Sequence, residues 1–168
     1  GTISNLKVTD ATIVTAHSAG AIAGVIQGTV ENCSAEDITI TCLPELIGTE
    51  WDNGDKAGSI VGYLGSGTVT GCSAKNVDIT CYRDMGGIVG CSNGTVTNNT
   101  VGENVSITYD NDETRNYNNY TSAAQHNIGD YIGRGADEND IGNTGTAIYV
   151  RGETAGTAEE LSAILAGC

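Results

Sequence analysis

Residues 58 to 81, Gly58-Ser-Ile-Val-Gly-Tyr-Leu-Gly-Ser-Gly-Thr-Val-Thr-Gly-Cys-Ser-Ala-Lys-Asn-Val-Asp-Ile-Thr-Cys81, are one complete copy of a repeat that decides the fold. A second copy spans residues 20–42 and a third spans 86–109, with a partial copy at each end of the chain. The phrase Gly-Thr-(Val/Ile) begins at residues 1, 28, 67 and 94, at spacings of 27, 39 and 27 residues. The middle spacing is 27 residues plus an insertion between Cys42 and Gly58. A repeat of about 27 residues is typical of proteins that stack similar units.

Within each copy, apolar residues alternate with polar ones, as at Val77 and Ile79. β-Branched residues at a period of two, with glycine at the breaks, are typical of short strands. We expect three strands in the complete copy, at residues 58–62, 67–72 and 76–81. Three strands in about 27 residues can bury their apolar faces only by stacking each copy on the next.

The repeat therefore predicts an all-β, single-domain parallel β-solenoid, a right-handed β-helix of about five coils with three short strands each. The solenoid domain is expected to span residues 1–156, with insertions at 43–55 and 110–127. The phrase Thr157-Ala-Glu-Glu160 fits a helix capping box. Residues 157–168 are accordingly expected to form a short helix that caps the solenoid or links it to a following domain.

Stacking would place equivalent residues about 4.8 Å apart, so that each position becomes a ladder. Four inward ladders are expected to form the core: Ala11/Ile38/Val77/Val105, Ile13/Ile40/Ile79/Ile107, Ile3/Val30/Val69/Val96 and Ile22/Ile60/Ile88/Tyr131. The cysteines follow the same scheme, because Cys33 is equivalent to Cys72 and Cys42 to Cys81. The ladder spacing is slightly long for a disulfide, which favours buried thiols over bridges.

The composition narrows the classes of partner. The 168-residue chain has 24 glycines, no phenylalanine and a net charge of -14 at pH 7. This charge repels phosphate backbones and anionic lipids, so no nucleic-acid partner is expected. The apolar runs are only a few residues long, which disfavours direct insertion into a membrane.

Both insertions are expected to leave the solenoid at the same corner. Between them lies a short connection through Tyr82, Arg83 and Asp84. Two long loops beside a short corner would form a cleft about 10 Å wide. Long loops on a regular scaffold are where binding residues concentrate. The candidate ligand-binding residues at this edge are Trp51, Asp52, Tyr82, Arg83, Tyr117, Tyr120 and His126.

The glycine phrases also carry a family resemblance. Gly86-Gly-Ile-Val-Gly90, together with Gly58-Ser-Ile-Val-Gly62, resembles the GLUG motif of large bacterial surface proteins, including some immunoglobulin A-cleaving metallopeptidases. The resemblance implies a repeat module of a secreted or cell-surface bacterial protein, and hence an extracellular location. The zinc motif His-Glu-x-x-His of those peptidases has no counterpart in this sequence, so their catalytic domain is not implied.

The sequence does not predict an enzyme. Neither His17 nor His126 has a neighbouring nucleophile or carboxylate in a catalytic arrangement. No cofactor is expected other than calcium, for which Asp110, Asp112 and Glu113 are the candidate ligands. These residues do not match the twelve-residue helix-loop-helix calcium pattern, and a solvated acidic loop is the simpler interpretation.

Three functions follow from these expectations. The first is a non-catalytic structural or adhesive module whose loop-lined edge contacts a host or cell-surface protein or a glycan. The second is self-association, in which the open ends of the solenoid stack into an extracellular filament. The third and weakest is a carbohydrate-active β-helix enzyme, which would need clustered carboxylates on one outer face.

Overall fold

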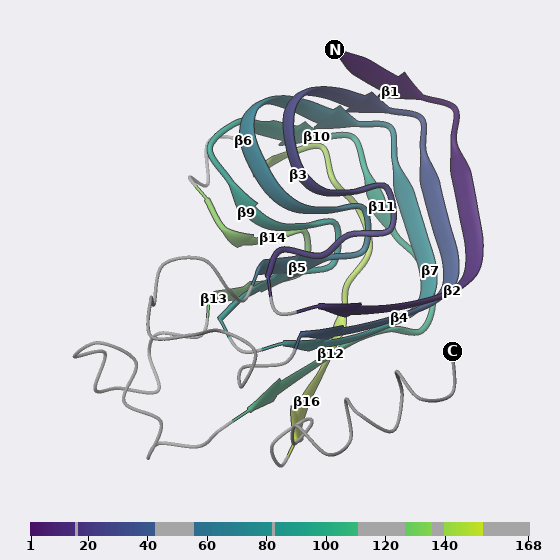
Figure 1. Ribbon diagram of the computed structural model, residues 1–168, viewed down its shortest axis with the longest axis vertical. Coiled ribbons are helices and arrows are strands. Elements are labelled where there is room, and N and C mark those ends of the chain that lie inside the picture. The colour runs from purple at the N-terminus through teal and green to yellow at the C-terminus, as the bar shows by residue number, and fades with distance from the viewer. Residues whose placement is uncertain (16, 43–55, 82, 111–126, 136–139, 153–168) are drawn as a thin grey trace.

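The structure is a computed structural model, and it describes residues 1–15, 17–42, 56–81, 83–110, 127–135 and 140–152 (Figure 1). The described residues form strands and no helix. Neighbouring strands in each sheet are parallel, and they come from successive copies of the repeat rather than from consecutive segments. The predicted all-β class with parallel sheets is confirmed, and the arrangement is β-helix-like.

The strands belong to three sheets. The seven-stranded sheet follows the order β1 (Thr2–Ser4), β3 (Ala23–Glu31), β6 (Val61–Thr70), β10 (Thr95–Thr97) and β15 (Asp140–Ile141), and it also contains β9 (Val89–Ser92) and β14 (Ile132–Arg134). The six-stranded sheet contains β2 (Lys7–Thr15), β4 (Ser34–Cys42), β7 (Ser73–Cys81), β12 (Val105–Asp110) and β16 (Ile148–Gly152), with β11 (Thr100–Val101) beside β7. The three-stranded sheet contains β5 (Lys56–Gly58), β8 (Asp84–Gly86) and β13 (Asn127–Gly129).

All four predicted inward ladders are present. Ile40 pairs with Ile79, which pairs with Ile107, and all three side chains are fully buried. The ladders that contain Ile3, Ile38 and Ile60 are in the predicted register as well. Because these buried residues stack in register from copy to copy, the core is a continuous column inside the strands. Burial of each such side chain stabilises the fold by roughly 1.5–3 kcal/mol.

Left-handed residues set the corners of the winding. In β2, β4 and β7, the pairing of the six-stranded sheet skips one residue of each strand, where the backbone has positive φ and the strand turns (Figure 1). The equivalent residue of the next copy directly precedes β12. Short polar side chains and glycine tolerate this conformation best. The residues at this corner are Asp10, Asp37, Asn76 and Asn104, and a second corner is formed by Asn5, Asn32, Gly71, Asn98 and Gly142.

The segment predicted as one strand at residues 58–62 is instead divided between two strands by a sharp turn at Ser59 and Ile60. β5 ends at Gly58 and β6 begins at Val61. A Cβ atom added at Gly62 would lie 2.5 Å from the backbone nitrogen of Ala19, so there is no room for one. The two glycines therefore allow close backbone packing at the turn, which strand periodicity alone does not reveal.

The five described cysteines are buried and form no disulfide, in agreement with the predicted thiol ladders. The ladder of Cys33 and Cys72 continues as Asn99 and Asn143 in the next copies. The backbone N–H of Cys33 donates to Cys72 Sγ at 3.4 Å, that of Cys72 to Asn99 Oδ1 at 2.8 Å and that of Asn99 to Asn143 Oδ1 at 2.7 Å. Burial raises the pKa of the Cys72 thiol to about 11, so it is protonated at neutral pH.

Three of the predicted segments fall beyond the described ranges, the second insertion in its residues 111–126. The insertion at 43–55 and the helix at 157–168 lie outside the described residues. Asp110 and Asn127, the predicted limits of the second insertion, are the last residue of β12 and the first residue of β13.

Candidate functional site

The three connections that lead into the three-stranded sheet begin at neighbouring strands and end at neighbouring strands. They follow β4, β7 and β12, which are neighbours in the six-stranded sheet, and they lead into β5, β8 and β13, which are also neighbours. The first residues of the receiving strands, Lys56, Asp84 and Asn127, are in register. We call residues 56–63, 83–93 and 127–134 the loop edge.

A buried lysine lies at the loop edge. The side chain of Lys56 is largely enclosed, with the residue 7% exposed, and its Nζ lies 5.7 Å from the centroid of the Tyr63 ring. This is a cation–π distance. The Tyr63 hydroxyl in turn accepts a hydrogen bond from Asn93 Nδ2 at 2.8 Å. Lys56 is thus held against an aromatic ring that is itself fixed from a neighbouring coil.

A buried carboxylate follows Lys56 in the same ladder. Asp84 is fully buried, and its Oδ2 lies 3.4 Å from Nε of Arg134. The Arg134 side chain is 47% exposed, so this ion pair reaches from the interior to the surface. Asp84 therefore has a cationic partner from the following coil as well as Lys56 beside it in the sheet.

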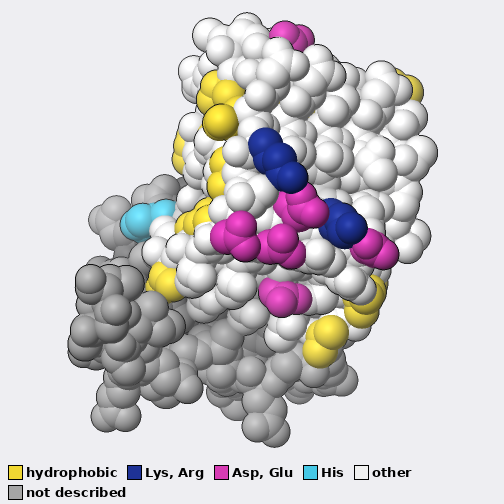
Figure 2. Space-filling model, turned by 90° about the vertical axis from the view of Figure 1, so that its right-hand side faces the viewer, with side chains coloured by type: hydrophobic (Ala, Val, Ile, Leu, Met, Phe, Trp, Pro, Cys, Tyr) yellow, Lys and Arg dark blue, Asp and Glu magenta, His cyan; other side chains and the backbone are white. Residues whose placement is uncertain are grey.

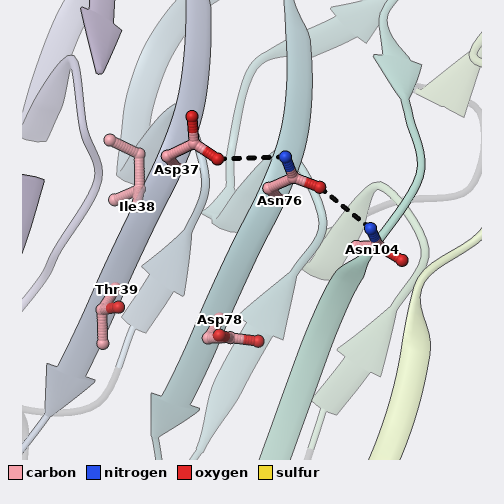
Figure 3. Close-up of a pocket in the computed structure, with 6 residues that line it drawn as sticks. All are labelled: Asp37, Ile38, Thr39, Asn76, Asp78 and Asn104. Atoms are coloured by element: carbon pink, nitrogen blue, oxygen red, sulfur yellow. Dashed lines mark hydrogen bonds between the residues drawn. The ribbon is translucent and has the colours of Figure 1, made fainter. Parts of the chain in front are cut away.

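A second polar surface lies on the outer face of the six-stranded sheet. An open groove of about 350 Å³ is lined by Asp37, Ile38, Thr39, Asn76, Asp78 and Asn104 (Figure 3). Asn104 Nδ2 donates to Asn76 Oδ1, and Asn76 Nδ2 donates to Asp37 Oδ1, each at 3.0 Å. Ser106 Oγ donates to Asp78 Oδ1 at 2.5 Å. The polar groups of this groove largely satisfy one another.

Ion pairs flank the groove. Acidic and basic side chains gather in a band across this face (Figure 2), where Lys7 Nζ lies 2.5 Å from Glu36 and Lys75 Nζ lies 2.6 Å from Glu103. The hydrogen bond from Lys75 lowers the pKa of Glu103, and the same bond raises the pKa of Lys75. Exposed pairs of this kind contribute little to stability, and their charges are already matched.

Most of the predicted site residues lie outside the described part of the chain. These are Trp51, Asp52, Tyr82, Tyr117, Tyr120 and His126, together with the calcium candidates Asp112 and Glu113 and the side chain of Asp110. Arg83 is described: it is half-buried and directly precedes the buried Asp84. The structure therefore places one predicted site residue at the loop edge.

Sequence reasoning missed Lys56, Tyr63 and Arg134. A signal for two of them exists in the repeat, because Tyr63 and Arg134 each follow the last glycine of a glycine phrase. The equivalent residues in the other copies are Val25 and Cys91. Tyr63 and Arg134 are large and polar at a position that is apolar in the other copies. This difference is a signal in the sequence that the two residues could have a role outside the core.

Within the described ranges, no group of three or more His, Cys, Asp and Glu side chains could hold a metal ion. No helix in those ranges is long and apolar enough to cross a membrane. Comparisons with protein-family models, with curated proteins and with solved structures returned no match. The functional inference therefore rests on the chemistry of the loop edge and on the stacking of the strands.

Proposed function

We propose that this chain is a non-catalytic structural and adhesive module of a bacterial secreted or cell-surface protein, and that its loop edge binds a protein or a glycan. In this proposal the module is a right-handed β-solenoid of about five coils, followed by a C-terminal capping or linker helix. The resemblance to the GLUG motif supports the location, and the parallel stacked sheets support the role of a stiff scaffold.

The observation that carries the binding role is the cluster of Lys56, Tyr63, Asp84 and Arg134 at the roots of the loops. On the outer face, Lys7 and Lys75 are matched by carboxylates of neighbouring strands. At the loop edge, aromatic, cationic and amide groups meet where the chain departs from its repeat, and Arg134 pairs there with the buried Asp84. Aromatic and arginine side chains are enriched where proteins bind partners tightly.

The proposal is tested by applying the labelled chain to arrays of glycans and of host extracellular proteins. We expect binding to at least one class, with a loss of tenfold or more in Tyr63→Ala combined with Arg134→Ala. The matched control is Thr39→Ala combined with Lys75→Ala on the outer face, which should bind as the wild type does. Trp51→Ala with Tyr117→Ala extends the test to the loops. An empty array, or equal losses in both sets of variants, would reject the adhesive role.

A second candidate function, self-association, is favoured by the exposed ends of the stack. No described strand covers the outer edge of β1 or β2, and Val25 and Leu6 near this end are 62% and 45% exposed. At the other end, Ile141 and Ile148 are 57% and 53% exposed. An uncovered strand edge beside apolar side chains is a template for strand addition.

Sedimentation at rising concentration, with electron microscopy of the concentrated sample, tests this second function. A stacking protein would form assemblies that grow with concentration, and Val25→Lys with Leu6→Lys would shift their onset to higher concentration. A monomer that persists at high concentration would reject it.

A further inference from the structure

We propose that the chain forms a closed dimer through the N-terminal end of its stack, with β2 of one copy running antiparallel to β2 of a second copy. This inference rests on the second candidate function, self-association. It names the surface that makes the contact and limits the assembly to two copies.

The N-terminal end of the stack presents uncovered apolar ladders. β1 and β2 are the first strands of their sheets (Figure 1), and no described strand pairs with their outer edges. Leu6, at the ladder position of the buried Cys33, is 45% exposed. The first members of the ladders are partly buried, whereas the members that follow them in the next copy are buried; these first members are Ile3, Val8, Ala11, Ile13 and Ile22. Unpaired strand edges beside exposed apolar side chains are a template for pairing with another chain.

The opposite end of the stack has polar side chains at ladder positions. Among the described residues, the ladder of Val96 ends at Asp140, and the ladder of Asn99 ends at Asn143. Asn143 Nδ2 donates to Asp140 Oδ1 at 2.6 Å and to the carbonyl oxygen of Val96 at 2.8 Å. Two ladders are therefore closed by polar groups that bond within the last copies.

Two tyrosines contribute to the same end. Tyr149 is in register with the buried Ile107, and its hydroxyl donates to Asp130 Oδ1 at 2.6 Å. The Tyr131 hydroxyl donates to the carbonyl oxygen of Gly145 at 2.7 Å. The last copy thus satisfies these polar groups by itself, and the C-terminal end of the stack is the more polar of the two ends.

This polarity disfavours head-to-tail stacking. Continuing the ladders from one copy of the chain into the next would place Ile3 against Asp140 and Leu6 against Asn143. Removing a carboxylate from water beside an isoleucine side chain, which offers no donor, is unfavourable. The N-terminal end therefore does not match the C-terminal end of a second copy.

The exposed isoleucines near the C-terminal end lie on the sides of the stack. Ile141 is in register with Thr97, and Ile148 is in register with Ser106. Both partners are polar and alternate with buried residues of their strands, so side chains at these positions point outward. These isoleucines do not supply the end surface that a head-to-tail contact would need.

Two N-terminal ends match each other. A two-fold axis brings the same surface of both copies together, so apolar ladder ends meet apolar ladder ends. It also sets the two β2 strands antiparallel, an orientation in which strand edges pair at least as well as in the parallel one. Residues 1–19 contain one lysine, one aspartate and one histidine, so their formal charge at pH 7 is zero in a chain of net charge -14. The contact brings no net charge together, and it leaves no second N-terminal end for a third copy.

The test uses sedimentation velocity and light scattering of the 168-residue chain over a range of concentrations. The measured mass should rise from that of one copy to that of two copies and then stay constant. Leu6→Lys should raise the dissociation constant of the dimer at least tenfold, because each copy then adds a charge to the contact. Ile148→Lys is the matched control, since Ile148 is 53% exposed at the other end, and it should change the constant less than twofold.

Folding of the variants is checked by circular dichroism. Hydrogen exchange of the wild type locates the contact without a substitution: amides of β2 should exchange at least tenfold more slowly in the dimer than in the dilute monomer, and amides of β16 should not change. Assemblies that keep growing with concentration would overturn the closed dimer while upholding self-association, and a monomer at every concentration would overturn both. Equal effects of Leu6→Lys and Ile148→Lys, or slower exchange at β16 instead of β2, would overturn the N-terminal contact.

Discussion

The side chain of Asn99 secures the backbone of Cys72, because the Cys72 N–H donates to Asn99 Oδ1 at 2.8 Å. The same amide donates from Nδ2 to the carbonyl of Val69 at 3.1 Å. One coil earlier, Cys72 Sγ accepts from the N–H of Cys33 at 3.4 Å, and its single S–H lies 3.4 Å from the carbonyl of Thr70 and 3.8 Å from that of Val30. Cysteine and asparagine are thus alternative solutions to one backbone requirement.

Replacing Asn99 by alanine should lower the free energy of unfolding by about 2–4 kcal/mol, because it leaves the buried N–H of Cys72 without its side-chain acceptor and removes the hydrogen bond to the carbonyl of Val69. Asn99→Cys should cost less, since the thiol can accept from the same N–H, as Cys72 Sγ does one coil earlier. Urea unfolding under reducing conditions measures both. Equal losses in the two variants would contradict the equivalence.

The wild type should lose stability as the pH rises from about 9 to about 11. The pKa of Cys72 is raised to about 11 by burial, so above its ordinary value of 9.0 the unfolded chain releases this proton before the folded one does. The contribution is complete below pH 9 and its loss amounts to up to about 2 kcal/mol. Urea unfolding at pH 8 and at pH 10.5 measures it. Cys72→Asn, which carries no ionisable group, should show a smaller loss than the wild type between the two pH values.

The interior of this fold could be predicted from the sequence because the repeat fixes it. Once Ile38 and Val77 are recognised as equivalent, parallel stacking leaves one register, and the structure has it. The continuation of the Cys33 ladder as Asn99 could not be predicted from hydropathy, because an apolar position became polar. Only its hydrogen bonds to the backbone explain why a buried amide is stable there.

The turn at the glycine phrase gives a sharp steric prediction. Gly90→Ala should destabilise the fold by about 3 kcal/mol or more, because the new Cβ would lie 2.5 Å from the backbone nitrogen of Ala57. Gly65→Ala is the matched control, since its Cβ would lie 3.3 Å from Cγ of the flexible Gln27 side chain. It should change stability by less than about 1 kcal/mol. Thermal and urea unfolding of the pair decide the point, and similar effects at both positions would contradict it.

The corner at Asn76 allows backbone strain to be separated from hydrogen bonding. Asn76 has a φ of 50° and bonds to both Asp37 and Asn104. Asn76→Ala should cost about 2–3 kcal/mol, because it loses both bonds and places alanine in the left-handed region. Asn76→Gly loses the same bonds without that strain and should cost about 1 kcal/mol less than alanine. If glycine were as damaging as alanine in urea unfolding, the left-handed conformation would not be the cause.

The position of the candidate site could be predicted from the sequence, but most of the residues that form it could not. The unequal spacing of the copies indicates the corner where the chain departs from the repeat, and the strands there do lie side by side. Lys56 and Asp84 each look like an ordinary charged residue at the start of a strand. Their surroundings include partners that no local pattern relates to them, the Tyr63 ring beside Lys56 and, from a later copy of the repeat, Arg134 beside Asp84.

The parallel register between successive copies limits how such a chain can change its length. A residue inserted within β4 or β7 would shift every later side chain to the opposite face, whereas a whole copy can be added or removed with each ladder intact. The connections that follow β4, β7 and β12, before the three-stranded sheet, differ in length from copy to copy. Duplication of whole copies can therefore lengthen the scaffold, while small insertions change one edge of it. The length of the module and the residues at its binding edge can evolve independently of each other.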